Sequence, residues 1–364
     1  MKILLTGGGS GGPVSPVLAV AEAIKKVHPK TQFLFVGTKK GPEREMVEQV
    51  GIRFVSIPAS KWRRYFTWRN ILAPIVLLFG FFSAYFVVSK FRPNVVFSAG
   101  GFVGVPVCWA AKIFKIKIVI HQQDARVGLA NKLVAPFADQ ITTTFEGTAK
   151  QFYSGSGLFD NKLKPRAEWV GNPVRPTLQT SKADVNKYFQ LHDRLPILLV
   201  LGGATGSDQI NQLIEKILPQ LIKSHQVVHQ TGKNKNYIKF KDPNYHAFEL
   251  IPFLEYAAIL KAAHLVIARA GLSTIAELSA LGKTAIIIPM PQTHQEDNAK
   301  ILIYTNSAVV LFGQSANSDN LIRAINHLKF NPTSAKTLAA NISQLMPKDA
   351  ADRIAKIVLQ NGRE

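Results

Sequence analysis

The sequence has little cysteine and little acidic charge. Its single cysteine, Cys108, cannot form an intramolecular disulfide or a cysteine metal site, and it fits a reducing cytoplasm. There are 44 lysine and arginine residues but only 23 aspartate and glutamate residues, which gives a formal net charge of +21. We therefore expect an anionic partner, and the candidates are nucleic acid, an acidic membrane surface and a phosphorylated substrate.

Several motifs that would indicate other functions are also missing. No DNA- or RNA-binding motif occurs, so we expect no nucleic-acid partner. No Lys-Ser/Thr pair follows the N-terminal glycines, which excludes a Walker phosphate loop. We expect no cleavable signal peptide, because the first residues pass directly from an apolar strand into glycines. With 364 residues and 47% hydrophobic content, the chain is long and apolar enough for two folded domains.

Two glycine-rich turns stand at matching places in the two halves of the chain. The first follows an apolar strand from Lys2 to Thr6 and covers residues 7–12, and a helix comes next. The second follows a strand from Ile197 to Leu201 and covers residues 202–206. A strand, a glycine turn and a helix in this order can cradle a diphosphate, because the helix N-terminus presents free N–H groups. The alternative is a tight turn without a ligand.

This repeated pattern predicts an α/β protein with the GT-B fold, in which two Rossmann-like domains face a central cleft. We place the first domain at residues 1–165 and the second at residues 166–345. Residues 346–364 contain an amphipathic helix, which we expect to pack back on the N-terminal domain. Such a pair of domains is typical of nucleotide-sugar transferases.

The second half contains a further strand, glycine turn and helix. An apolar strand ends at Ala268, a turn follows at Gly271, and a helix runs from about Ser273 until Gly282 ends it. Glu277 lies one turn into this helix. A carboxylate there does not favour phosphate, but it can accept two hydroxyl protons from a ribose. The alternative is a solvated helix glutamate in an ordinary strand–turn–helix unit.

The segment from Ser60 to Pro93 combines basic flanks with a long apolar run. Residues Ile71 to Val88 carry no charge and reach the length of a membrane-spanning helix. We expect Pro74 and Gly80 to break this run, and a spanning helix would separate the flanking glycine turns across the bilayer. Residues 60–93 are therefore predicted to lie in the interface of an anionic membrane. The alternative is a pair of buried crossover helices.

A polar cluster follows another apolar strand in the first half. The strand from Ile118 to Ile120 ends in His121, Gln122, Gln123 and Asp124. Polar side chains at the carboxyl end of a parallel strand point toward the place where chemistry occurs in such sheets. His121 is therefore a candidate site residue, and the alternative is a structural hydrogen-bonding histidine.

Seven motifs together resemble the MurG family of GT-B glycosyltransferases. They are, in family order, GGGSGGPVSPVLAVAEAI, SAGGFVGVP, HQQDARVGLANK, VGNPVR, LGGATGSDQINQ, ARAGLSTIAEL and HQEDNA. The resemblance covers nearly the whole chain. It implies inverting transfer of N-acetylglucosamine from UDP-N-acetylglucosamine to the muramoyl 4-hydroxyl of undecaprenyl-diphospho-muramoylpentapeptide. It also implies a peripheral enzyme at the cytoplasmic face of the bacterial cell membrane, acting in cell-wall synthesis and so in cell shape and division.

The resemblance assigns substrate-binding roles to sixteen positions. They are Ser10, Gly11, Gly12, Asp124, Arg175, Ala204, Thr205, Phe253, Gly271, Leu272, Ser273, Thr274, Ile275, Glu277, His294 and Gln295. In the second domain, residues 272–274 look like the turn over the donor diphosphate, Glu277 like the ribose acceptor and Phe253 like the residue whose backbone holds uracil. His294 and Gln295 match a polar pair that contacts the sugar hydroxyls.

The remaining implied roles concern the acceptor and the phosphates. Residues 10–12 look like the loop that faces the acceptor diphosphate and the donor sugar, and Arg175 resembles the family arginine near the phosphates. Cationic groups and N–H donors can stabilise departing UDP without a metal ion. No Asp-x-Asp motif is present, so we expect a metal-independent reaction and no cofactor.

Departures from the family pattern leave the general base open. The family usually has a histidine, proposed as the base, where this chain has Pro13. Gln122 replaces a glutamate, Asp124 replaces an asparagine, and Ala204 replaces a serine whose hydroxyl the neighbouring threonine could supply. We hypothesise that Asp124 took over the base role, which a carboxylate facing a sugar hydroxyl can perform. His121 is the second candidate.

Three alternatives to the leading function remain at this stage. Asp124 could only bind the donor sugar, and the chain would then be a non-catalytic or weakly active UDP-sugar-binding homologue. A GT-B transferase with another lipid acceptor is the second alternative. A UDP-sugar epimerase of similar architecture is the third, although a soluble substrate would not explain the apolar, basic segment at residues 60–93.

Overall fold

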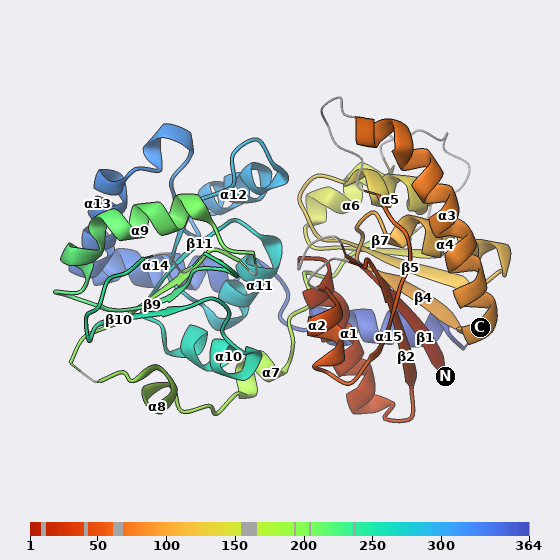
Figure 1. Ribbon diagram of the computed structural model, residues 1–364, viewed down its shortest axis with the longest axis horizontal. Helices are drawn as coiled ribbons and strands as arrows, with labels where there is room; N and C mark the ends of the chain where they lie inside the picture. The colour runs from red at the N-terminus through yellow and green to blue at the C-terminus, as the bar shows by residue number, and fades with distance from the viewer. Residues whose placement is uncertain are drawn as a thin grey trace. The chain divides into compact units, whose positions relative to one another are not determined.

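The computed structural model describes residues 1–8, 12–39, 43–60, 68–153, 166–192, 194–203, 205–235 and 238–363. The chain divides into two units, each a parallel sheet with helices on both faces (Figure 1). The first unit comprises Met1–Arg175 together with Pro347–Glu364, and the second comprises Pro176–Met346. Both are Rossmann-like α/β units, as the repeated strand–turn–helix pattern predicts.

The first unit is built on a seven-stranded sheet with the order β3-β2-β1-β4-β5-β6-β7. The strands are β1 (Lys2–Thr6), β2 (Gln32–Gly37), β3 (Arg53–Ser56), β4 (Val95–Ser98), β5 (Lys117–Gln122), β6 (Gln140–Thr143) and β7 (Arg166–Trp169). All neighbouring pairs are parallel. The central strands are continuous apolar runs because helices cover both of their faces.

The helices of the first unit form one core on each face of this sheet. They are α1 (Val14–Val27), α2 (Glu43–Glu48), α3 (Trp68–Phe91), α4 (Gly104–Ile113), α5 (Leu129–Val134), the 3-10 helix η1 (Ala135–Phe137), α6 (Glu146–Tyr153) and α15 (Ala350–Asn361). One core joins α1 and α15 to the sheet, and the other joins α3 and α4 to its opposite face. In α15, Ile354 and Val358 are fully buried in the same core as Val14 and Val17 of α1.

The second unit is built on a six-stranded parallel sheet with the order β10-β9-β8-β11-β12-β13. The strands are β8 (Ile197–Leu201), β9 (Gln226–Gln230), β10 (Tyr245–Phe248), β11 (Leu265–Ala268), β12 (Ala285–Ile287) and β13 (Val309–Val310). The helices are α7 (Thr177–Thr180), α8 (Val185–Phe189), α9 (Asp208–Leu221), α10 (Phe253–Ala262), α11 (Leu272–Leu281), α12 (His294–Tyr304), η2 (Gly313–Ser315), α13 (Ser318–Phe330) and α14 (Pro332–Ser343).

The first unit extends farther along the chain than expected. Residues 166–169 form β7, which pairs in parallel with β6, so the first unit continues to Arg175 instead of ending at residue 165. In the second unit, β10 ends at Phe248 and α10 begins at Phe253. The extended backbone of Pro252 precedes the first turn of α10, where a helix starts readily because proline has no N–H to satisfy.

The apolar segment of the first unit is one helix, not two. Pro74 lies inside α3 near its N-terminal end, and the helix continues through Gly80 to Phe91. A side chain at Gly80 would lie 2.3 Å from the Pro58 carbonyl oxygen, so this glycine allows close packing and does not end the helix. The expectation that Pro74 and Gly80 break the run is therefore wrong.

Candidate functional site

The glycine turn after β1 packs backbone to backbone on the turn after β4. A Cβ atom on Gly101, whose φ is +84°, would lie 2.4 Å from the Gly8 carbonyl oxygen. Only glycine fits this approach at position 101. Of the residues that the resemblance assigns to this turn, Ser10 and Gly11 lie outside the described residues, while Gly12 is exposed.

Pro13 stands at the N-cap of α1, where the family histidine would be. Its φ of −68° suits the start of a helix, and no side-chain hydrogen bond caps α1. The pyrrolidine ring can neither accept nor donate a proton. A base for a reaction at this edge of the sheet must therefore come from another element.

His121 lies at the end of β5 with no exposed surface. Its Nδ1 is 3.0 Å from the Thr142 hydroxyl, and its Nε2 is 3.1 Å from Oδ1 of Asn172. Burial lowers the pKa of His121 to about 4, so the ring is neutral near pH 7. A buried, neutral and doubly hydrogen-bonded ring favours the structural alternative over a catalytic role for His121.

Asp124 lies on a turn after β5 that the Gln122 side chain holds in place. The Gln122 amide nitrogen donates to the backbone carbonyls of Asp124 (2.9 Å) and Arg126 (3.1 Å). Its amide oxygen accepts from Asn131 Nδ2 (2.7 Å) and from the Gly128 N–H (3.4 Å). A glutamate at position 122 could not donate to the two carbonyls. Asp124 itself is half-buried on this turn.

Arg175 closes the first unit and pairs with a carboxylate of α1. Its Nε donates to Oε2 of Glu22 at 3.0 Å, and its side chain is mostly buried. This ion pair fixes the end of the first unit to α1. The resemblance assigns Arg175 to the phosphates, and the structure provides a positioned guanidinium whose charge Glu22 partly balances.

In the second unit, the turn after β11 leads directly into α11. Gly271 is the N-cap of α11, no side chain caps the helix, and its first turn contains no acidic residue. The first N–H groups of such a helix and its dipole can bind a diphosphate. Ile275 is fully buried, and its N–H donates to the Gly271 carbonyl at 3.0 Å. Its implied role in binding would therefore be to shape the turn rather than to touch a ligand.

Glu277 lies farther along α11 and is only 8% exposed. Its Oε2 accepts a hydrogen bond of 2.5 Å from the hydroxyl of Tyr256 on α10. The Tyr256 ring lies 6.3 Å, between centroids, from the ring of Phe253 at the start of α10. The structure thus brings together the two residues to which the resemblance gives the ribose and the uracil, through a tyrosine that sequence reasoning missed.

The N-terminus of α12 lies beside the same turn. Asn298 Nδ2 donates to the Ala270 carbonyl at 3.2 Å, which ties α12 to the start of α11. Gln295 Oε1 accepts from the Met290 N–H at 3.0 Å, so this side chain also holds the turn after β12. His294 is exposed. The polar pair implied for the sugar hydroxyls therefore stands one helix away from Glu277.

The glycine turn after β8 is held by Gln230, which, like Tyr256, the sequence analysis did not select as a site residue. Gln230, at the end of β9, accepts from the Ile251 N–H (3.0 Å) and donates to the Gly203 carbonyl (3.3 Å). Its position as a polar residue after an apolar strand was the available signal. Thr205 is exposed in this turn, while Ala204 lies outside the described residues.

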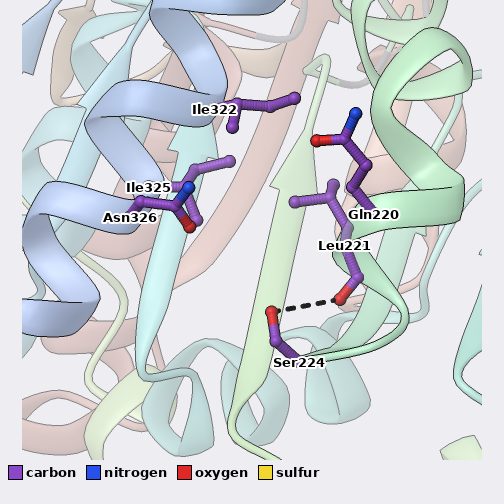
Figure 2. A pocket seen from close by; sticks show the side chains of 6 residues that line it. All are labelled: Gln220, Leu221, Ser224, Ile322, Ile325 and Asn326. Carbon is purple, nitrogen blue, oxygen red and sulfur yellow. Dashed lines mark hydrogen bonds between the residues drawn. The ribbon is translucent and has the colours of Figure 1, made fainter.

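A cavity of about 150 Å³ lies between α9 and α13 (Figure 2). It is lined by Gln220, Leu221, Ser224, Ile322, Ile325 and Asn326. The first three residues lie at or beyond the C-terminal end of α9, just before β9 begins, and so at the amino end of the strands, and the other three lie on α13. The cavity is therefore separate from the glycine turns and from Glu277. Over the parts of the chain that the structure describes, no group of three or more His, Cys, Asp or Glu residues could hold a metal ion.

Known proteins resemble the chain in sequence and in fold. The N-terminal domain profile of glycosyltransferase family 28 matches residues 3–143, and its C-terminal domain profile matches residues 197–354. The UDP-N-acetylglucosamine–N-acetylmuramyl-(pentapeptide) pyrophosphoryl-undecaprenol N-acetylglucosamine transferase of Listeria monocytogenes is 34% identical, over 99% of both chains.

Solved structures agree on the fold and not on the activity. The crystal structure of MurG from Acinetobacter baumannii superposes with a TM-score of 0.70 at 22% identity, covering 99% of both chains. A UDP-GlcNAc 2-epimerase from Neisseria meningitidis superposes with a TM-score of 0.72 at 16% identity, covering 99% of this chain and 100% of the epimerase. These likenesses show the GT-B fold, while the full-length sequence relationship separates transferase from epimerase. The chain belongs to glycosyltransferase family 28 and, within it, to the MurG family.

Proposed function

We propose that this chain transfers N-acetylglucosamine from UDP-N-acetylglucosamine to undecaprenyl-diphospho-muramoylpentapeptide. The observation that carries the proposal is the 34% identity to a transferase of that name over 99% of both chains. The product is the lipid-linked disaccharide precursor of peptidoglycan, so the enzyme serves cell-wall growth, shape and division. The epimerase alternative has support from the fold alone.

The donor side of the reaction uses the second unit. The N-terminus of α11 receives the diphosphate, and Glu277 accepts hydrogen bonds from the ribose. As the bond between the anomeric carbon and the diphosphate oxygen breaks, negative charge grows on departing UDP. The helix dipole and N–H groups are already oriented to stabilise that charge, and this supports a reaction without a metal ion.

The acceptor side uses the first unit. The muramoyl 4-hydroxyl oxygen attacks the anomeric carbon from the face opposite UDP, and a base takes the hydroxyl proton, so the configuration inverts. Asp124 is the proposed base, because Gln122 holds its turn and the residue is half-buried rather than enclosed. Pro13 cannot take the proton, and His121 has no exposed surface.

The exposed face of α3 is proposed to bind the membrane. Gly80, Ala84 and Val88 face the first unit and are buried, whereas a second apolar face is exposed. That exposed face comprises Ile75, Leu78, Phe79, Phe82 and Phe86. The segment Pro74–Phe91 is long and apolar enough to cross a bilayer by length and composition, with a mean hydropathy of 1.8. Because one face of α3 is packed on a folded unit, we favour a helix that lies in the interface.

This surface fits a peripheral enzyme at the cytoplasmic face of the membrane. Lys90 and Arg92 lie at the end of α3, and Lys115 follows Phe114, the residue after α4. The Phe114 ring lies 4.8 Å, between centroids, from that of Tyr85 on α3. Lysine and arginine beside an apolar surface favour anionic phospholipid. The net charge of +21 would then serve lipid headgroups and diphosphates rather than nucleic acid.

Transfer of labelled N-acetylglucosamine to the lipid-linked acceptor tests the function. We expect turnover by the unmodified protein in the presence of chelator. A protein that binds UDP but transfers sugar only after Pro13→His would instead be a UDP-sugar-binding homologue that has lost its base. Inactivity of both proteins, with UDP binding intact, would point to a different lipid acceptor.

A further inference from the structure

Tyr256 and Glu277 form a partly buried contact between two helices of the second unit. Tyr256 lies in the first turn of α10, and Glu277 lies in the second turn of α11. The hydroxyl donates to Oε2 of the carboxylate at 2.5 Å, a length typical of a hydrogen bond to an ionised acceptor. Since Glu277 is only 8% exposed, water competes little for this contact.

The environment of the hydroxyl keeps it a donor. Burial, and then the negative charge of Glu277, raise the pKa of Tyr256 well above its usual value of about 10. The phenol therefore stays protonated throughout the working pH range. A protonated phenol beside a carboxylate can donate to it, and it fixes the rotation of the carboxylate about its last side-chain bond.

We infer that Tyr256 is a positioning residue, which orients Glu277 to accept the ribose hydroxyls of the uridine diphosphate donor. The inference rests on the proposed function, in which Glu277 contacts ribose. A carboxylate has lone pairs for about four hydrogen bonds, and the bond from Tyr256 uses only one of them. The contact therefore selects one orientation of Glu277 and uses only part of its hydrogen-bonding capacity.

The same helix links this carboxylate to the base-binding position. Phe253 and Tyr256 lie three residues apart on α10, with their rings 6.3 Å apart. Residues at this spacing lie on one face of a helix. The start of α10 thus sets both the position implied for uracil and the orientation of the ribose acceptor. Selectivity for ribose over deoxyribose should therefore depend on a tyrosine that touches neither sugar hydroxyl.

Binding of UDP and of 2′-deoxy-UDP, measured by calorimetry, tests this role. The unmodified protein should prefer UDP by about tenfold, the value of one hydrogen bond of a hydroxyl to a charged acceptor. Tyr256→Phe removes only the hydroxyl and should reduce this preference to about threefold, mainly by weakening UDP. Glu277→Gln should remove most of the preference. Tyr304→Phe, at a tyrosine that is 92% exposed in the same unit, should behave as the unmodified protein.

The outcomes separate this inference from the function on which it rests. If Tyr256→Phe weakens both ligands by the same factor while Glu277→Gln removes the preference, Tyr256 only joins α10 to α11 and the positioning role is overturned. If Glu277→Gln keeps the preference, Glu277 is not the ribose acceptor, and the inference fails with that assignment. A lack of UDP binding by the unmodified protein would overturn the proposed donor itself. Thermal unfolding of each variant verifies that it is folded.

Discussion

Asp124 in the first unit and Glu277 in the second are the two carboxylates with proposed roles, and they are held in different ways. Glu277 belongs to a helix, is nearly buried, and receives a hydroxyl directly on its carboxylate. Asp124 belongs to a turn and is half-buried, and the Gln122 amide holds its backbone carbonyl. The difference matches the tasks: a binding group benefits from a fixed orientation, whereas a base must reach its substrate and carry a proton away.

The glycine turns, in contrast, are supported in the same way in the two units. In the first unit, Gly8 after β1 is packed against Gly101 after β4. In the second, a Cβ atom on Gly206 after β8 would lie 2.1 Å from the Thr231 carbonyl oxygen after β9. Each phosphate-type turn is thus supported by the backbone of a neighbouring turn. The two units therefore share the packing of their glycine turns and differ in how Asp124 and Glu277 are held.

Of the substitutions proposed for the two carboxylates and their surroundings, one that removes the proton-accepting ability of Asp124 should have the largest effect. We expect Asp124→Asn to lower turnover by about 10²- to 10⁴-fold, the usual contribution of a general base. UDP affinity should be nearly unchanged, because its proposed contacts lie in the second unit. Steady-state transfer kinetics with Asp352→Asn, an exposed aspartate of α15, provide the matched control. Unchanged turnover in Asp124→Asn would rule out Asp124 as the base.

The two units also differ in their proposed membrane contact, which we assign to the exposed face of α3 in the first unit. We expect Phe79→Ser combined with Phe82→Ser to weaken binding to vesicles of anionic phospholipid by at least about tenfold, because each exposed ring contributes apolar area to the membrane contact. Cosedimentation measures the binding, and Tyr304→Ser in the second unit is the control. Equal binding by the double variant, or equal binding of the unmodified protein to zwitterionic vesicles, would contradict the proposed surface.

The turn that carries Asp124 can be tested through Gln122. Gln122→Glu replaces two N–H donors with a carboxylate oxygen that faces the Asp124 and Arg126 carbonyls. We expect the free energy of unfolding to fall by about 2–3 kcal/mol, because a buried charge would meet two unsatisfied acceptors. Urea unfolding measures the change, with Gln360→Glu on the exposed side of α15 as the control. A variant as stable as its control would show that the amide does not hold the turn.

The sequence predicted the scaffold well because the scaffold follows from local patterns. Apolar runs followed by glycine placed β1, β8 and β11, and Gly282 ends α11 in the left-handed conformation that its position requires. The error at β7 arose because strand pairing is not local, and the error at Gly80 arose because a glycine can serve close packing as well as chain reversal.

The side-chain networks could not be predicted in the same way. Tyr256 and Glu277 are 21 residues apart on different helices, and no spacing rule links them. Gln122 was noted as a departure from the family pattern, but its two bonds to carbonyls depend on the path of the turn. His121 illustrates the same limit, because a strand-end histidine can face a ligand or the core, and only its neighbours Thr142 and Asn172 decide.

His121 in the first unit and His229 in the second are both fully buried, and both should make stability depend on pH. Burial lowers the pKa of His121 to about 4 and that of His229 to about 3. Each takes up a proton near pH 6.5 in the unfolded chain, so the unfolded state binds more protons between pH 6.5 and the lowered value. Stability is therefore full above pH 6.5 and falls as the pH decreases through this window. At pH 5, each histidine should cost about 2 kcal/mol relative to pH 7.

Substitution separates the two contributions. His121→Gln should remove about 2 kcal/mol of the difference between unfolding free energies at pH 7 and pH 5, whatever its effect at pH 7 alone. His28→Gln, at an exposed histidine of the first unit, should leave the difference intact. Urea unfolding at the two pH values measures both. If His121→Gln retains the full difference, the ring is charged in the folded state, and its candidacy as a proton acceptor regains support. If the difference falls by about 2 kcal/mol as expected, His121 is a neutral structural group like His229, and the proton-accepting role in the first unit is left to Asp124.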